Sequence, residues 1–204
     1  MTMPLDLVAS HVALKSWVDG QLGEDGALLA YAAGEYTTVW GHQNGPRPDL
    51  PYAVLSWPRA FATVGGKPAR SIVDGEDDTF VERVEYDAEA VFRVEIFSSA
   101  ALDPDSGVDE ALALACGLEA SIRTSRQLEL FMLAGLAFVE NGPPLAVPVV
   151  AGFGFERRAQ LDITFRARVR VDALDVPVLD STSVTDISGT VDEDGAIIGT
   201  VGTA

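Results

Sequence analysis

Residues 157–171, RRAQLDITFRARVRV, constrain the fold more than any other feature of this sequence. Every second residue from Ala159 to Val171 is apolar, and the positions between them carry polar or charged side chains. Successive side chains of a β-strand point to opposite faces of its sheet, so this period of two predicts a long strand with one buried face. The other face of this strand would carry the arginines Arg158, Arg166, Arg168 and Arg170.

A second stretch, residues 80–97, has the same period. Its apolar positions are Val84, Tyr86, Ala88, Ala90, Phe92, Val94 and Ile96, and its alternate positions include Glu85, Asp87 and Glu89. Two such strands predict a mainly antiparallel, twisted sheet with helices packed on its apolar face only. If the strands are neighbours, the three carboxylates lie across from Arg166, Arg168 and Arg170. Each exposed pair would then contribute roughly 0.2–1 kcal/mol.

The rest of residues 1–173 supplies helices and shorter strands. Apolar spacing predicts an amphipathic helix over residues 4–22, with Leu7, Leu14, Val18 and Leu22 on its buried stripe. A second helix is expected within residues 102–123, capped by Asp105 or Ser106, and a third is expected to be capped by Thr124 or Ser125 and to stop at Gly135. Short strands are predicted at residues 36–40 and 52–57 and on both sides of the turn Asn141–Gly142. Residues 64–80 are expected to form a hairpin tip or an exposed loop.

The sequence changes character after residue 173. Residues 174–204 are rich in Thr, Asp, Gly and Val, have no helical period and contain almost no large side chains. Such a segment cannot build a core alone, so it is either disordered or an extended arm that adds to another surface. We therefore expect an α+β domain over residues 1–173, followed by an extended or flexible C-terminal arm over residues 174–204.

The charge of the chain limits the partners it can bind. It has 31 acidic and 14 basic residues, for a formal net charge of -17. Binding to phosphates needs clustered Lys and Arg, so this composition argues against a protein that grips nucleic acid. Strong acidity is compatible with a surface past which DNA must slide without sticking, and equally with solubility alone.

No signature of catalysis or targeting is present in the sequence. The two histidines, His11 and His42, offer little for a metal site or a catalytic triad, and His11 is expected to be a packed, hydrogen-bonded helix residue. No complete phosphate-binding loop occurs. The single Cys116 cannot form an intramolecular disulfide, and no signal sequence or membrane span is expected. We expect no catalytic residues, no cofactor and no metal.

Five stretches together resemble the tail-terminator or neck-terminator proteins of long-tailed bacteriophages. They are the N-terminal helix, DLPYAVLSWPR, VEYDAEAVFRVEIFS, the helix before SRQLELF, and FERRAQLDITFRARVRV, which span residues 4–175. The resemblance implies a structural virion protein of the phage neck, assembled in the host cytoplasm into a homo-oligomeric, six-subunit ring. Such a ring caps the tail tube, contacts the tube protein and any sheath protein, and joins the tail to the head–tail connector or stopper. DNA passes through its channel without specific binding.

The sequence is compatible with two arrangements of the charged strand faces. The arginines and carboxylates either pair with each other within one sheet or meet another copy of the chain. In the second case, Arg158, Arg166, Arg168 and Arg170 would lie at a subunit or tube contact, and Glu85, Asp87 and Glu89 would face the channel.

Other classes of protein also fit this sequence. The chain could be another ring component of the same machine, such as a stopper, adaptor or tube protein. A small soluble ligand-binding domain or enzyme is the remaining alternative.

Overall fold

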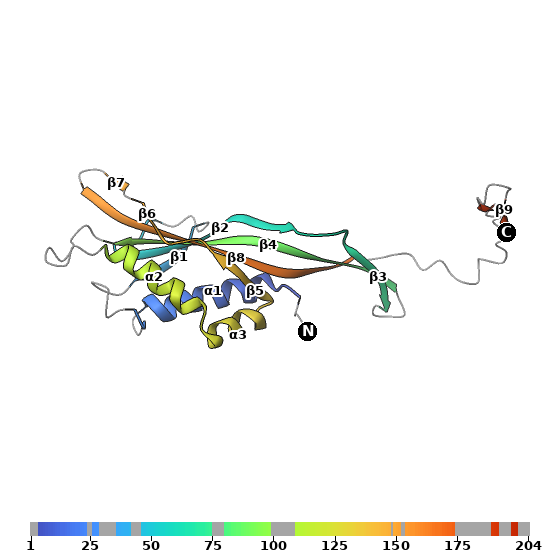
Figure 1. The fold of residues 1–204 in the computed structure, drawn as a ribbon, viewed down its shortest axis with the longest axis horizontal. Helices are drawn as coiled ribbons and strands as arrows, with labels where there is room; N and C mark the ends of the chain where they lie inside the picture. Colours follow the sequence, from blue (N-terminus) through green and yellow to red (C-terminus); the bar gives the residue numbers. More distant parts are fainter. Residues whose placement is uncertain are drawn as a thin grey trace. The chain divides into compact units, whose positions relative to one another are not determined.

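The computed structural model describes residues 4–23, 26–28, 36–41, 46–74, 80–98, 109–147, 149–151, 154–173, 189–191 and 197–199. Its three helices are α1 (Leu7–Leu22), α2 (Glu110–Ile122) and α3 (Ser125–Leu133). The strands of the main sheet are β1 (Thr37–Trp40), β2 (Tyr52–Thr63), β4 (Phe80–Ser98), β8 (Gly154–Ala173) and β5 (Leu136–Asn141). The predicted α+β class is confirmed (Figure 1).

The main sheet has the order β1-β2-β4-β8-β5. β2 is antiparallel to β4, with Tyr52 opposite Phe97, and β5 is antiparallel to β8, with Leu136 opposite Ala167. The short strands β6 (Leu145–Ala146) and β7 (Val149–Ala151) also pair antiparallel with β8. β1 is the exception to the predicted antiparallel pattern, because it runs parallel to β2.

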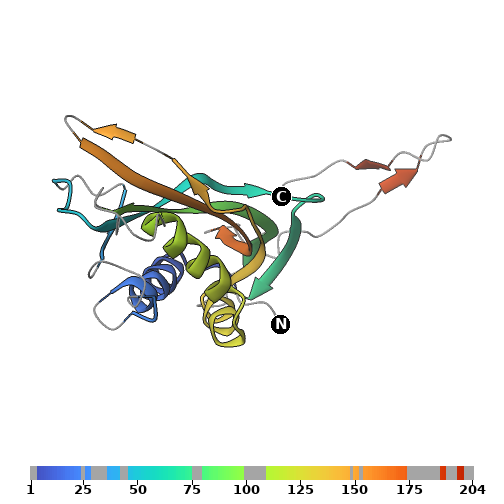
Figure 2. The same cartoon turned by 60° about the vertical axis from the view of Figure 1, so that its left-hand side comes forward.

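One continuous core fills the space between the helices and one face of this sheet. The two views of the ribbon place α1, α2 and α3 on the same side of the strands (Figures 1 and 2). At the ends of the two long strands the predicted burial is wrong for Val171, which is 50% exposed, and only partial for Val84, Tyr86 and Val169. Along the middle of both strands the alternation read from the sequence is confirmed, because the apolar residues there are buried in this core. They include Ala88, Ala90, Phe92, Val94 and Ile96 of β4, and Ala159, Leu161, Ile163, Phe165 and Ala167 of β8.

The first helix is shorter than the sequence predicts. It begins at Leu7 because Asp6 caps it, with Asp6 Oδ1 accepting a hydrogen bond from the Ala9 amide at 3.0 Å. Three of the four predicted stripe residues, Leu14, Val18 and Leu22, are fully buried. Leu7 is 54% exposed, so its assignment to the stripe was wrong.

The cap predicted for the second helix is also wrong. α2 begins at Glu110, and Asp109 caps it by accepting a hydrogen bond from the Leu112 amide at 3.2 Å. Asp105 and Ser106 lie outside the described residues. Several acidic or hydroxyl side chains precede this helix, and the tertiary packing of α2 selects which of them serves as the cap. The third helix agrees with the prediction, with Thr124 at the N-cap position and Gly135 just beyond its end.

Residues 64–80, for which the sequence predicts a hairpin tip or an exposed loop, contain a strand. β3 (Ala69–Asp74) pairs with β4, so the segment is part of a hairpin. β3 belongs to a separate compact unit, which consists of residues 69–84 and 171–204. Within this unit, Arg83 makes a bidentate ion pair with Asp172, at 2.8 and 3.1 Å. The same unit contains β9 (Gly189–Val191) and β10 (Ile197–Gly199), which pair antiparallel; the remainder of the predicted arm lies outside the described residues.

Gly135 allows the chain to turn tightly between α3 and β5. Its φ is +77°, and a Cβ at this position would lie 2.7 Å from the Pro4 carbonyl oxygen and 3.1 Å from the Leu5 Cα. We expect Gly135→Ala to lower the free energy of unfolding by at least about 1–2 kcal/mol, since it adds both left-handed strain and a backbone clash. Urea denaturation of the purified protein measures this loss.

Gly20→Ala is the matched control for this substitution. Gly20 lies inside α1, and a Cβ there would meet nothing within 4 Å. The same change of residue should therefore raise stability by roughly 0.5–1 kcal/mol. Equal effects of the two substitutions would contradict the proposed role of Gly135.

Candidate interaction surface on the charged face of the sheet

Six charged side chains form a regular row of ion pairs across β4 and β8. The three arginine Nε atoms lie 3.0, 3.4 and 2.8 Å from the acceptor oxygens in the pairs Arg166–Glu89, Arg168–Asp87 and Arg170–Glu85. The partners step by two residues in opposite directions along the two strands, which is the pattern of an uninterrupted antiparallel pairing. We call these six residues the charged ladder.

The charged ladder confirms that the two predicted strands are neighbours and that the three arginines of one strand lie across from the three carboxylates of the other. It also shows that the arginines and the carboxylates share one face of the sheet. The arginine side chains are 48, 46 and 38% exposed, and the Asp87 side chain is 47% exposed. The six residues are therefore paired within the chain and still accessible to another molecule. Any surface that meets this face meets both signs of charge in a fixed order.

The same face continues along both strands with a second set of ion pairs. Arg93 donates two hydrogen bonds to Asp162, at 2.7 and 2.9 Å, and Gln160 donates to the same carboxylate at 3.1 Å. The hydrogen bonds that Arg93 donates to the Asp162 carboxylate raise the pKa of Arg93 above its ordinary value. Arg158 pairs with Glu95, so it lies on the predicted face but outside the charged ladder.

An aromatic pair on this face was missed by the sequence analysis. The rings of Tyr52 and Phe97 stack at 4.6 Å between centroids, with an interplanar angle of 9°. The Arg47 guanidinium lies 5.3 Å from the Tyr52 ring centroid, and the Arg158 guanidinium lies 5.4 Å from that of Phe97. One signal was available: Phe97 follows Ile96, so the apolar alternation of residues 80–97 breaks there. No local pattern connects Arg47 to this pair.

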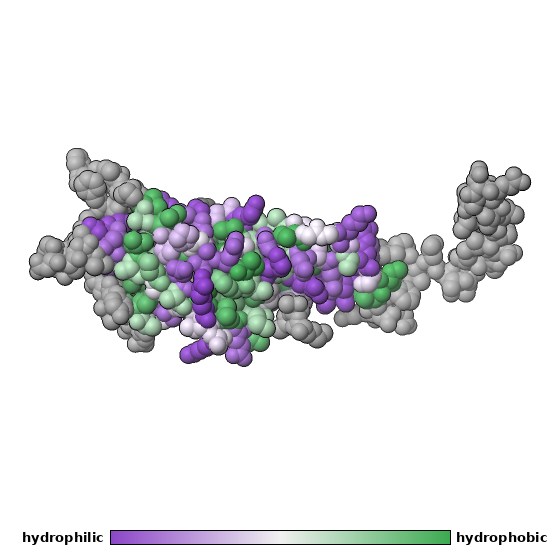
Figure 3. Space-filling model, viewed as in Figure 1, coloured by the Kyte–Doolittle hydropathy of each residue, from purple (hydrophilic) through white to green (hydrophobic). Residues whose placement is uncertain are grey.

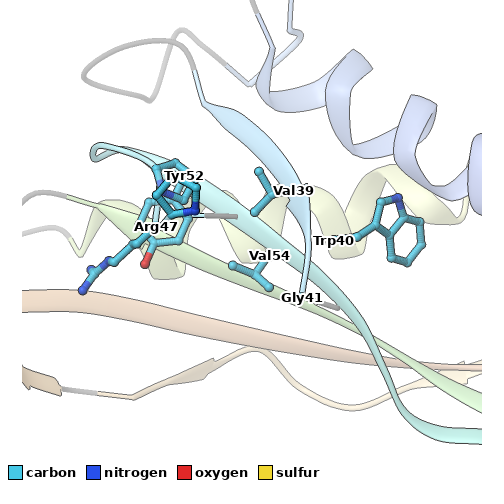
Figure 4. A pocket seen from close by; sticks show the side chains of 8 residues that line it. Val39, Trp40, Gly41, Arg47, Tyr52 and Val54 are labelled. Atoms are coloured by element: carbon cyan, nitrogen blue, oxygen red, sulfur yellow. The ribbon is translucent and has the colours of Figure 1, made fainter. Parts of the chain in front are cut away.

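A hollow of about 230 Å³ lies next to the aromatic pair, where β1 and β2 meet the loop that follows β1. Its lining residues are Val39, Trp40, Gly41, Pro46, Arg47, Pro48, Tyr52 and Val54. Val39 and Val54 lie at its centre, Arg47 lies against Tyr52 at one side, and Trp40 points away on the opposite side of β1 (Figure 4). Ligand sites usually measure roughly 300–1,000 Å³, so this hollow suits a few side chains better than a whole ligand.

Two titratable side chains on the helix-covered side of the sheet, Tyr36 and His11, serve in packing and hydrogen bonding. Burial raises the pKa of the Tyr36 phenol, and the neighbouring Glu110 carboxylate raises it further, so Tyr36 stays protonated and donates to Glu110 at 3.2 Å. His11 makes the contacts expected of a packed helix residue: its Nδ1 lies 2.7 Å from the Leu7 carbonyl oxygen, and Trp57 donates to its Nε2 at 3.3 Å. The second histidine, His42, lies outside the described residues.

The described part of the chain contains neither a candidate metal centre nor a candidate membrane-spanning helix. Within those ranges, no group of three or more His, Cys, Asp or Glu residues could hold a metal ion. None of the helices described above is long and apolar enough to cross a bilayer.

Comparison with known proteins identifies the family of this chain. No curated protein matches the sequence. The sequence profile described as "Phage neck terminator protein" matches residues 11–194, which include most of α1, all of α2 and α3, the main sheet and the charged ladder. This family contains structural proteins of the bacteriophage neck, which associate with other neck and tail proteins of the virion. With nine-tenths of its length matched, the chain belongs to the phage neck terminator protein family.

Proposed function

We propose that this protein forms a six-subunit ring that caps the phage tail tube and joins it to the head–tail connector or stopper. The match to the neck terminator family over residues 11–194 carries this proposal. The ring would assemble in the host cytoplasm, contact the tube protein and any sheath protein, and enclose a channel for DNA. Its role is structural, without a catalysed reaction, a cofactor or a metal.

The charged ladder is the proposed contact face. Arg166, Arg168 and Arg170 would meet a neighbouring subunit or the tube, and Arg158 would extend this contact along β8. Glu85, Asp87 and Glu89 would border the channel where the same face reaches its rim. Alternating charges held in register by two strands select a partner with the complementary order and reject others, which supports a contact role.

The charge of the chain supports the passage of DNA. A formal net charge of -17 makes the protein repel a polyanion, so DNA would move through the ring without being retained. The arginines of the charged ladder are neutralised by carboxylates, so they do not form a patch for phosphate binding. Specific DNA recognition is therefore not part of the proposed function.

Native mass spectrometry across a concentration series tests the proposed ring. We expect a discrete hexamer with no larger species, because a terminator stops at one ring. A ladder of ever larger assemblies would instead identify a tube protein, the second candidate among ring components. A protein that stays monomeric at every concentration should be mixed with isolated tails; failure to bind tail ends as a ring would refute the proposal.

A further inference from the structure

Each edge of the main sheet carries one charged side chain that has no partner in the described part of the chain. β1 pairs with β2 only as far as Leu55, and no other described strand pairs with that side of β2, so the rest of β2 is itself an edge. Arg59 lies on this stretch. β5 forms the opposite edge, and Glu140 lies on it. Both residues are exposed, and neither side chain makes an ion pair or a hydrogen bond with a described residue.

The two charged residues lie at opposite ends of one row across the sheet. Arg59 is opposite Val91 of β4. Glu140 is opposite Thr164 of β8. The ion pairs between β4 and β8 step by two residues on each strand, and this register places Val91 opposite Thr164. Residues that lie opposite each other share a face of the sheet. The row on the charged face therefore ends in a cation at one edge and in an anion at the other, at the same level along the strands.

Both edge strands are irregular next to these charged residues. β2 has register shifts on both sides of Arg59, and β5 has one directly before Glu140. Such β-bulges interrupt the ladder of backbone hydrogen bonds and re-aim the neighbouring side chains. At the edge of a sheet they oppose the addition of a further strand. A partner would therefore meet these edges through side chains and not by extending the sheet.

Exposed apolar side chains accompany the charge at each edge. Val8 and Val12 are exposed beside His11 on α1, and His11 packs on the tryptophan rings of β1 and β2. Leu133 and Val139 are exposed on α3 and β5, at the opposite edge. The surface drawn in Figure 3 intersperses hydrophobic and hydrophilic residues, so on that face no single apolar area would dominate association. A contact that combines a few apolar side chains with one ion pair fits such a surface.

We propose that the β2 edge of one copy meets the β5 edge of the next copy, with Arg59 against Glu140. The exposed valines of α1 then pack against Leu133 and Val139 of the neighbour. This inference rests on the proposed ring and names its contact between subunits. The opposite charges of the two edges favour this pairing over contact between two like edges.

The geometry of the row suits a ring. Because the two surfaces are different, the contact is head-to-tail, which closes into a ring or continues as a filament. Arg59 and Glu140 lie at the same level, so neighbouring copies can be joined without a displacement along the strands. A contact that adds no displacement from copy to copy favours closure.

Exchange of the two charges tests the contact. Native mass spectrometry across a concentration series compares four full-length proteins: the unaltered chain, Arg59→Glu, Glu140→Arg and the double variant. Each single substitution places like charges against each other and should weaken association at least about tenfold. The double variant restores an opposite pair, so its association should return to within about threefold of the unaltered chain.

Lys67→Glu is the matched control. Lys67 is exposed between β2 and β3, and its substitution changes the charge of the chain as Arg59→Glu does. It should leave association unchanged. All the substituted residues are exposed, so urea denaturation should show the same stability for every variant.

The outcomes separate this contact from the ring itself. If the unaltered chain forms a hexamer and the single variants form it equally well, or the double variant does no better than they do, the contact is wrong and the ring stands. If the unaltered chain assembles only on isolated tails, the same loss and recovery are expected there. Loss and recovery of dimers or filaments, without any hexamer, would support the contact and contradict the ring. A chain that neither self-associates nor binds tails overturns both proposals.

Discussion

Phe165→Ala is expected to lower the free energy of unfolding by about 3–5 kcal/mol. Phe165 is fully buried in β8, and its ring centroid lies 5.1 Å from that of Phe131, 6.4 Å from Phe138 and 6.5 Å from Phe92. These rings belong to α3, β5 and β4, so the substitution opens a cavity where a helix meets three strands. The loss is a large fraction of the roughly 5–15 kcal/mol by which a domain is stable.

Urea denaturation followed by circular dichroism measures this effect. Val12→Ala is the matched control, because Val12 is 60% exposed on α1 and should change the stability by no more than about 0.5 kcal/mol. A loss below about 1.5 kcal/mol for Phe165→Ala would mean that the neighbouring side chains collapse into the space. In that case, the four rings would not be the close-packed centre described above.

The long strands could be predicted from the sequence because their pattern is local. From Ala159 onward, apolar and polar residues alternate along β8. The polarity of each residue therefore indicates which face of the sheet its side chain occupies. Two strands with this pattern also constrain their own pairing, since a shift of one residue would move every side chain to the wrong face. The placement of the three arginines across from the three carboxylates therefore followed from the sequence once the strands were assumed to be neighbours. The individual pairs did not, because a shift of two residues keeps every side chain on its own face.

The remaining features depend on contacts between distant segments. The parallel direction of β1 is set by how residues 41–51 connect it to β2, which has no periodic signal. Asp109 caps α2 in place of the predicted Asp105 or Ser106, and this choice depends on how α2 packs. Arg47 meets Phe97 only because β2 brings Tyr52 beside β4, so the aromatic pair and the hollow next to it could not be predicted.

Inverting the charged ladder is expected to abolish assembly while the fold remains intact. The variant exchanges the two strands' charges, with Arg166, Arg168 and Arg170 changed to Glu and with Glu85, Asp87 and Glu89 changed to Arg. Each cross-strand pair is retained with its ends reversed, and the net charge of the chain is unchanged. Each such exposed pair contributes at most about 1 kcal/mol, so the free energy of unfolding should stay within roughly 1 kcal/mol of the original.

Changing only the arginines would be a weaker experiment. Carboxylates would then face carboxylates across β4 and β8, and a loss of assembly could reflect a damaged sheet. The inverted ladder avoids this ambiguity, because only the pattern offered to a partner is reversed.

Against a partner built for the original order, like charges now meet, at a cost of several kcal/mol. This corresponds to association weakened by at least about a hundredfold. Native mass spectrometry and binding to isolated tails measure the effect.

The control inverts an ion pair on the helical side of the molecule. Lys15 pairs with Asp19 on α1, and exchanging these two residues reverses a partly exposed pair that is not on the charged face of the sheet. This exchange should leave assembly unchanged. If the inverted ladder assembled as well as the original protein, the row of ion pairs would serve only to join β4 to β8. The face that contacts a partner would then have to lie elsewhere, and the two edges of the main sheet would be the next surfaces to test.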